Sequence, residues 1–394
     1  MRICVVYDCL YPYTVGGAER WARNLAERLA QEGHQVSYLT LRQWDRGERV
    51  ELDRRVRVLI AGPRMALYTG QRRRIAPTLR FGLGVFWQLL RRRRSYDVVH
   101  LSAWPFFAAL AAKAALLGTP TLIAVDWHEV WSRRYWQEYL GRPGGAVGYA
   151  LQRLCARVPQ SAFCFSRLHA ARLRREGLCG PVTVLEGEYA GSLQAPTARP
   201  AEPLVVFAGR LIPEKRAPLA VAAFAQAAAR LESLRGEFYG DGPEREALLR
   251  AIEEHDVAEI ATAPGFVPAA RIDAALRRAL CMLSTSRREG YGMVVVEAAA
   301  RGTPSIVVAG EDNAATELIE QGVNGLVVQS ADPAEIADAI LAVHRAGMDM
   351  RQSTAYWFAE NARRLSLESS LRTVLESYGS HDPAASLGGA GARG

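Results

Sequence analysis

The stretch of sequence that decides the fold is STSRREGYGMVVVE, residues 284–297. The apolar run Leu280–Ser284 leads into it and predicts a buried strand, and Met293–Arg301 predicts a helix. The polar loop between them contains Gly290 and Gly292. A strand, a glycine-containing loop and a helix in this order are typical of a parallel α/β sheet, where ligands bind at the carboxyl ends of the strands.

The same stretch contains two carboxylates that suit different parts of one ligand. Glycine N–H groups at the start of a helix face the positive end of its dipole, where phosphate oxygens bind. Glu289 lies on the loop, close to where a sugar on a bound diphosphate would lie. Glu297 lies about five residues into the helix, roughly 7–8 Å along its axis, a distance that suits the ribose. The alternative is a structural carboxylate, although one among Val and Ala residues needs a partner.

A second candidate loop is FAGRLIPEKR, residues 207–216, which follows the predicted strand Leu204–Ala208. Arg210 and Lys215 on this loop are two cations able to hold a diphosphate without a metal ion. A solvated surface pair is the alternative interpretation, but Lys215 is one of only two lysines in the chain. The sequence contains no Asp-x-Asp motif. We therefore expect a site that needs no metal and no cofactor.

Two further candidates lie in the amino-terminal half. Gly17 belongs to a loop that follows the predicted strand Ile3–Tyr7 and opens the predicted helix Ala18–Gln31, and glycine there lets a diphosphate approach the backbone. A plain strand-to-helix turn is the alternative. His128 follows the predicted strand Thr121–Val125, where it could contact a sugar or an acceptor. A structural histidine packed among tryptophans is the competing interpretation.

Apolar runs alternate with amphipathic stretches along most of the chain, which predicts two α/β domains in series. The proline-rich stretch 195–203 predicts a boundary, with one domain over 1–195 and the other over 196–365. Gln352–Tyr378 has the pattern of one long helix, and its last part, 366–378, is expected to pack back on the first domain. The tail 379–394 is rich in Gly, Ala and Ser, which predicts disorder.

Composition agrees with a globular protein of two domains, since the chain has 394 residues, 49% of them hydrophobic and 23% charged. The six cysteines are scattered with no Cys-x-x-Cys pair, which predicts buried reduced thiols and a cytoplasmic location. The first residues predict a buried strand rather than a signal peptide. The net charge of +8 is compatible with nucleic acid, an anionic membrane or a phosphorylated substrate.

The arginines gather around one apolar segment. Arginine runs at 72–74 and 91–94 flank the segment 81–90. Apolar residues beside arginines suit an anionic membrane surface better than nucleic acid, so we hypothesise peripheral contact with the inner face of a membrane and expect no nucleic-acid partner. An ordinary amphipathic helix with a solvated arginine end is the alternative.

Taken together, these motifs resemble glycosyltransferase family 4, a large retaining family with the GT-B fold. Glu289 and Glu297 match the family's two glutamates separated by seven residues. GGAER at 16–20 resembles the family's opening, and the loop 209–216 looks like its phosphate-binding loop. The turn 240–243 is similar to one of its supporting turns. The resemblance covers roughly residues 1–345.

The resemblance implies two Rossmann-like domains whose parallel sheets face a central cleft. It implies retaining, metal-independent transfer of a sugar from a UDP- or GDP-linked donor to a hydroxyl of a lipid-linked or cell-envelope glycan precursor. His128 and Glu289 would take the catalytic positions. The donor site would comprise Gly17, Arg210, Lys215, Val267, Gly290, Tyr291, Gly292, Met293, Val294 and Glu297.

Some positions depart from the family pattern. Tyr291 stands where phenylalanine is usual, and the loop 311–317 lacks the usual Gly-Gly, so the resemblance implies no particular sugar. A transferase for a soluble natural product and a sugar-nucleotide epimerase of the same fold stay open as alternatives. A phosphorylase would require a lysine for pyridoxal phosphate, which neither lysine's context suits. A hydrolase with two carboxylates across a bond is less favoured, because Glu297 lies along a helix.

Overall fold

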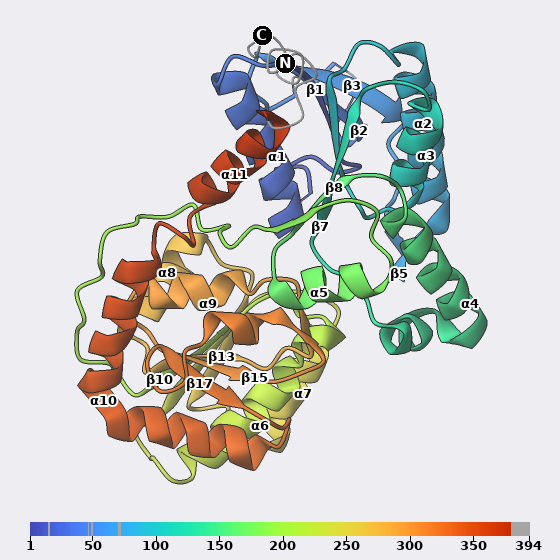
Figure 1. The fold of residues 1–394 in the computed structure, drawn as a ribbon. Coiled ribbons are helices and arrows are strands. Elements are labelled where there is room, and N and C mark those ends of the chain that lie inside the picture. The colour runs from blue at the N-terminus through green and yellow to red at the C-terminus, as the bar shows by residue number, and fades with distance from the viewer. Residues whose placement is uncertain (15, 46, 49, 70–71, 380–394) are drawn as a thin grey trace. The chain divides into compact units, whose positions relative to one another are not determined.

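The structure is a computed structural model in which residues 1–379 are described, apart from 15, 46, 49, 70 and 71. It contains two compact units (Figure 1). Unit 1 comprises Met1–Glu186 together with the described residues from Glu368 onward, and unit 2 comprises Gly187–Leu367. The predicted disordered tail lies, apart from residue 379, outside the described residues.

Unit 1 is built on a sheet that has seven parallel strands within the described residues, in the order β3-β2-β1-β6-β7-β8-β9. The strands are β1 (Arg2–Val6), β2 (Gln35–Leu41), β3 (Val56–Gly62), β6 (Val98–Ser102), β7 (Leu122–Trp127), β8 (Ser161–Cys164) and β9 (Val182–Val184). A short hairpin of β4 (Tyr68–Thr69) and β5 (Arg72–Arg73) lies outside this sheet. The strand order reverses between β1 and β6, which is the switch point where open α/β sheets bind ligands.

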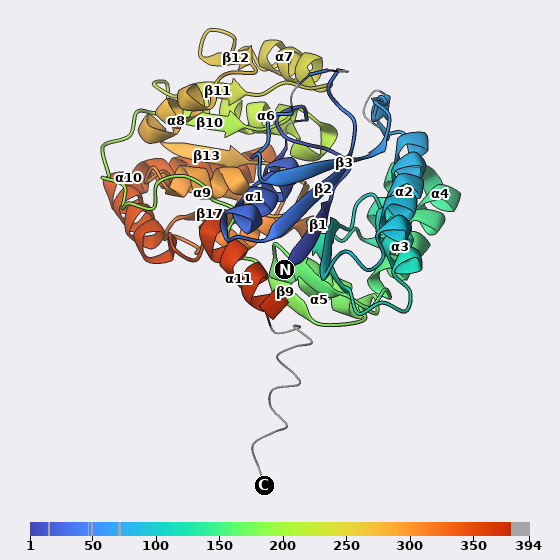
Figure 2. The same cartoon turned by 90° about the horizontal axis from the view of Figure 1, so that it is seen from above.

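Helices cover both faces of this sheet (Figures 1 and 2). The helices of unit 1 are α1 (Gly17–Gln31), α2 (Ile75–Arg91), α3 (Phe107–Ala115), α4 (Arg133–Ala156), α5 (Arg167–Arg175) and α11 (Leu367–Gly379). The helices α2 and α3 pack against each other over one face, and α1 lies with α11 over the other. An ion pair between Arg28 of α1 and Glu368 of α11, 2.7 Å long, joins the last two.

Unit 2 repeats the plan with a sheet that has six parallel strands among the described residues, in the order β12-β11-β10-β13-β15-β17. The strands are β10 (Leu204–Ala208), β11 (Arg235–Tyr239), β12 (Ala261–Gly265), β13 (Cys281–Ser284), β15 (Ser305–Val308) and β17 (Gly325–Val328). A separate two-residue ladder joins β14 (Arg288–Glu289) to β16 (Asp312–Asn313). Here the strand order reverses between β10 and β13, so the loops after these two strands meet at the switch point.

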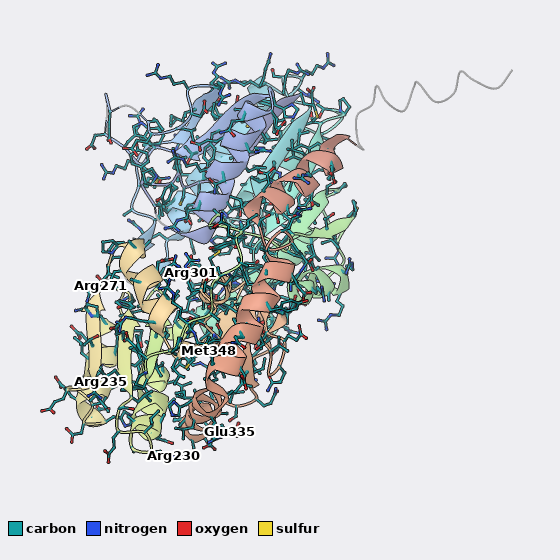
Figure 3. The ribbon with its side chains drawn as sticks, turned by 90° about the vertical axis from the view of Figure 1, so that its left-hand side faces the viewer. Arg230, Arg235, Arg271, Arg301, Glu335 and Met348 are labelled. Atoms are coloured by element: carbon teal, nitrogen blue, oxygen red, sulfur yellow. The ribbon has the colours of Figure 1, made fainter. Side chains whose placement is uncertain are left out.

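The helices of unit 2 complete its core. They are α6 (Ala217–Ala228), α7 (Arg245–Glu254), α8 (Ala269–Arg278), α9 (Met293–Ala299) and α10 (Pro333–Asn361), together with the 3₁₀ turns η1 (Pro213–Lys215) and η2 (Ala314–Leu318). Glu335 and Met348 mark the course of α10 (Figure 3), which kinks at Gly347. After the kink, buried Arg351 donates to the carbonyl oxygens of Ala279 at 2.5 Å and Arg277 at 2.8 Å. This guanidinium ties the second part of α10 to the end of α8.

The predicted fold class, two Rossmann-like α/β units with parallel sheets, is confirmed. The prediction of one long helix over Gln352–Tyr378 is wrong, because α10 ends at Asn361 and α11 begins at Leu367. Between them the backbone pairs with Tyr189, whose N–H donates to Leu365 and whose carbonyl accepts from Leu367. The prediction that all cysteines are buried fails for Cys179, which is exposed in the turn before β9.

Candidate active site

Hydrogen bonds join the loop after β10 to the loop after β13. Thr285 donates from Oγ1 to the carbonyl oxygens of Lys215, at 2.9 Å, and Arg216, at 3.1 Å. In return the Arg216 side chain donates to the carbonyl of Thr285 at 2.7 Å, and Arg287 N–H donates to the carbonyl of Glu214 at 2.8 Å. The two predicted ligand loops therefore form one surface at the switch point of unit 2.

On this surface the ammonium of Lys215 contacts the carboxylate of Glu289. Ser286 Oγ donates to the same carboxylate oxygen at 2.8 Å. The side chains of Lys215 and Glu289 are 20% and 16% exposed. Solvent therefore screens this ion pair less than a surface salt bridge, although both side chains still reach solvent. Two residues 74 positions apart in sequence are thus brought together, and a bound anion would compete with Glu289 for Lys215.

A largely buried guanidinium, that of Arg288, lies close enough to Glu289 to interact with its charge. Arg288 has only 14% of its side chain exposed, with Nη2 at 3.8 Å from Glu214 Oε1. Burial lowers the pKa of Arg288 to about 10, against the opposing effect of Glu289 and Asp312. Arg288 therefore remains charged at neutral pH and adds positive charge near Glu289.

Gly292 shapes the start of α9. It has φ 108°, and a Cβ atom there would lie 2.6 Å from Cβ of Ala315, so only glycine fits without displacing η2. Gly290 is half-buried and Tyr291 is buried in the same loop. Met293 and Val294 form the first turn of α9 with half-buried side chains. The predicted donor-loop residues thus share one tightly packed turn.

Arg210 lies on the β10 loop with an exposed side chain. The turn at Gly240 and Gly242 supports this loop from β11, because a Cβ at these glycines would lie 1.8 Å from the Gly209 carbonyl oxygen and 2.4 Å from that of Leu211. Leu211 N–H also donates to the carbonyl of Asp241 at 2.9 Å. The glycine turn therefore fixes the backbone from which Arg210 projects.

The remaining predicted residues of unit 2 lie on two elements. Glu297 is half-buried on α9, one turn beyond its start. Val267 follows β12 with only 7% of its surface exposed, whereas its neighbour Phe266 is 79% exposed. The accessible apolar side chain after β12 is therefore Phe266, the aromatic half of the predicted Phe266-Val267 pair.

In unit 1, Gly17 is the first residue of α1 and is exposed. A Cβ atom at Gly17 would have no neighbouring atom within 4 Å. The backbone at the start of α1 is therefore open to a ligand, although nothing in its packing requires glycine.

His128 follows β7 and is partly exposed. Its ring stacks on Phe165, with centroids 4.6 Å apart and an interplanar angle of 12°, and the edge of Trp21 packs on Phe165 from α1. Burial lowers the pKa of His128 below its usual value, and Asp126 opposes the shift. The imidazole is therefore neutral at pH 7 and held by aromatic packing. This geometry agrees with both predictions for His128, contact with a sugar or acceptor and a structural role.

A buried polar chain close to His128 was not predicted. Asp126 Oδ2 lies 2.8 Å from His100 Nε2 and accepts from Trp21 Nε1 at 2.7 Å. The hydroxyl of Tyr378, on α11, contacts His100 Nδ1. An aspartate inside an apolar strand was the only signal in the sequence, and its partner on α11 lies far along the chain. This chain of contacts fixes α11 to the sheet of unit 1.

An aromatic group at the carboxyl ends of β6 and β7 was also missed. Trp131 is its centre, with ring centroids 5.4 Å from Trp104, 4.6 Å from Trp136 and 5.2 Å from Tyr139. The Trp131 indole N–H donates to Glu129 at 2.8 Å. Trp104, Trp131 and Tyr139 are only partly buried. The edge of unit 1 where a ligand is expected therefore carries a fixed aromatic surface.

The described residues contain neither a metal-binding cluster nor a membrane-spanning helix. No group of three or more His, Cys, Asp or Glu side chains there is arranged to bind a metal ion. The helices of the same residues include none that is long and apolar enough to cross a bilayer.

Residues 193–363 match the family model for glycosyl transferases group 1, and residues 15–186 match that for Glycosyltransferase Family 4. The chain is 32% identical over 187 residues to the D-inositol 3-phosphate glycosyltransferase of Segniliparus rotundus, covering 45% of this chain and 40% of the relative. It is 31% identical over 169 residues to the GDP-mannose-dependent alpha-(1-6)-phosphatidylinositol monomannoside mannosyltransferase of Mycolicibacterium smegmatis, covering 40% and 44%. The chain thus spans less than half the length of these curated relatives.

The sucrose-phosphate synthase of Thermosynechococcus elongatus has a similar structure, with a TM-score of 0.78, 19% identity and coverage of 97% of this chain and 99% of that one. At that identity the likeness shows the fold alone. Two Rossmann-like units with such neighbours define the GT-B class of glycosyltransferases. The chain belongs to glycosyltransferase family 4, within glycosyl transferases group 1, as its motifs predicted.

Proposed function

We propose that this protein transfers a sugar, with retention of configuration, from a UDP- or GDP-linked donor to a hydroxyl of a lipid-linked or cell-envelope glycan precursor. The observation that carries the proposal is the contact between Lys215 and Glu289 on the joined loops of unit 2. A cation and a carboxylate at a switch point, beside the open start of a helix, suit a diphosphate and the sugar attached to it.

Each donor residue then has a distinct role. Arg210 and Lys215 bind the diphosphate, and the N–H groups from Gly290 to Val294 contribute to the same anion site. Glu289 contacts the donor sugar and Glu297 accepts from the ribose hydroxyls. Phe266, next to Val267, is exposed enough to stack on the base. No residue of this set has to act as a covalent nucleophile, because a leaving phosphate oxygen can accept the proton of the attacking hydroxyl on the same face of the sugar.

The unit 1 residues serve the sugar and the acceptor. His128 is neutral at pH 7, so it donates a single hydrogen bond to the donor sugar or the acceptor, while Gly17 leaves room for the diphosphate. The Trp131 aromatic group offers ring faces of the kind on which sugar rings stack. The name of the M. smegmatis relative states a phosphatidylinositol monomannoside acceptor. This name and the arginine-rich region of unit 1 favour work at the inner face of a membrane.

The proposal is tested by nucleotide release and product formation with UDP- and GDP-sugars and extracted lipid acceptors. Arg210→Ala with Lys215→Ala is expected to abolish transfer, and Glu297→Ala to raise the donor KM. The matched control is Arg250→Ala, an exposed arginine on α7, which should retain full turnover. Wild-type turnover in the double variant would refute the donor assignment.

A further inference from the structure

The helix α2 is apolar on its outer face as well as on its core face. Its core face buries Phe81, Val85 and Leu89. Its outer face presents Ile75, Leu79, Leu83 and Trp87, which are 66%, 44%, 56% and 52% exposed. These four recur at every fourth position, so they form one continuous stripe along the helix. A stripe of large exposed apolar side chains on a surface helix marks an interaction site.

The same region carries a large excess of positive charge. Residues 54–96 contain twelve arginines and no Asp or Glu, which exceeds the net charge of +8 for the whole chain. Arg80 and Arg91 lie on α2, and Arg93 and Arg94 follow its end, all with exposed side chains. Within the described residues, none of these four forms an ion pair with a carboxylate. Their charge is therefore available to an anionic partner.

Arg80 and Arg91 also line one surface pocket of about 380 Å³ between α2 and β3. The floor of the pocket is backbone, because Gly84 packs so closely that a Cβ there would lie 1.8 Å from the Ala61 carbonyl oxygen. Trp87 lines the same pocket and belongs to the apolar stripe. The two arginines are eleven positions apart, which places them on the same side of the helix. The pocket thus joins two guanidinium groups to an apolar edge.

We propose that α2 docks unit 1 on an anionic bilayer, with the stripe inserted among acyl chains and a lipid phosphate in the Arg80–Arg91 pocket. This inference rests on the proposed function, for which it names the docking surface. Paired arginines match phosphate oxygens, tryptophan is favoured at the membrane interface, and an interfacial helix combines an apolar stripe with flanking basic residues. The contact is peripheral, because the other face of α2 packs on β3 and α3 of unit 1.

Other occupants match the surface less well. Nucleic acid would satisfy the arginines but leave the apolar stripe in water. A second copy of the chain across a two-fold axis would bring the same arginines face to face, without a carboxylate in residues 54–96 to balance them. A bilayer containing acidic lipids satisfies both features together.

Vesicle co-sedimentation tests the proposal on the full chain. Wild type is expected to bind phosphatidylcholine vesicles containing phosphatidylglycerol and to lose binding in pure phosphatidylcholine and in high salt. Arg80→Gln with Arg91→Gln should weaken binding about fivefold per arginine, roughly thirtyfold for the pair. Leu83→Gln with Trp87→Gln should weaken it about tenfold or more. Arg199→Gln with Arg250→Gln and Leu249→Gln are exposed controls in unit 2, and they should bind like wild type.

Equal binding to neutral vesicles, no binding to either kind, or equal losses in the controls would each overturn the docking surface. So would self-association that the Leu83→Gln, Trp87→Gln variant abolishes without any vesicle binding. Thermal unfolding of each variant confirms that the fold is retained. Nucleotide-sugar binding by the wild type is measured in parallel without vesicles. Failure of the wild type to bind any nucleotide sugar would count against the proposed function and not against the docking surface.

Discussion

Gly292→Ala tests whether the shape of the donor loop depends on one residue. The native φ of 108° lies in a region that disfavours alanine by roughly 1–2 kcal/mol. The new Cβ would also lie 2.6 Å from Ala315 Cβ and 3.3 Å from Leu318 Cδ1, and overpacking of this kind costs about 1–3 kcal/mol. The expected loss in the free energy of unfolding is therefore about 3.5 kcal/mol.

Gly322→Ala is the matched control in the same unit. Gly322 has φ 78°, but a Cβ there meets no atom within 4 Å, so only the backbone penalty of about 1.5 kcal/mol applies. For a unit of this size, each kcal/mol lowers the Tm by about 2–4 °C. Calorimetry should therefore show a fall of about 10 °C for Gly292→Ala and about 4–5 °C for Gly322→Ala. Only Gly292→Ala should also weaken nucleotide-sugar binding, because it moves the start of α9.

Equal losses of stability in the two variants would refute this reasoning. They would show that the turn relaxes around a Cβ atom and that contact with η2 does not determine the loop. If Gly292→Ala loses more stability than Gly322→Ala but binds nucleotide sugars like wild type, the packing of this turn does not shape the donor site.

Three further variants test the roles of Tyr378, Arg351 and His128. Tyr378→Phe removes the hydroxyl that contacts His100 and should cost about 1–3 kcal/mol in unfolding free energy, so an unchanged urea midpoint would contradict the role given to α11. Arg351→Met fills the space but leaves the carbonyls of Ala279 and Arg277 without their donor. Urea unfolding should show a loss of about 2–3 kcal/mol in unfolding free energy, and an unchanged midpoint would contradict the role given to Arg351. The folded-state pKa of His128 lies below its unfolded value, so the unfolded chain binds the extra proton and stability falls as pH drops through about 6.5. His128→Phe should flatten the change in stability between pH 7.5 and 5.5, and an unchanged slope would show that another group causes it.

Local patterns were enough to predict most of the fold. The predicted strand Leu204–Ala208 agrees residue for residue with β10. The two predicted ligand loops follow β10 and β13, as the alternation of strands and helices predicted. That agreement has a physical reason, because strand and helix periods and glycine-containing turns act over a few residues. The contact of Lys215 with Glu289 was not predicted, although parallel strands end at the same edge of the sheet and so bring their loops together.

What sequence could not predict depends on long-range packing. Residues 352–378 read as one helix, and only the pairing of Leu365 and Leu367 with Tyr189 explains the break. The contact between His100 and Tyr378 joins residues 278 positions apart. The outer stripe of α2 was seen only as an apolar run, since exposure depends on which face packs on the sheet.

The central claim is that unit 2 binds a nucleotide-diphosphate sugar on the joined β10 and β13 loops. Isothermal titration calorimetry with UDP-, GDP-, ADP- and dTDP-sugars tests it most directly, on the wild type and on the Arg210→Ala, Lys215→Ala variant. We predict that one nucleotide class binds the wild type without added metal and that the variant loses this binding while keeping its Tm. Binding of equal strength in the variant, or no binding of any of the four classes to the wild type, would contradict the account.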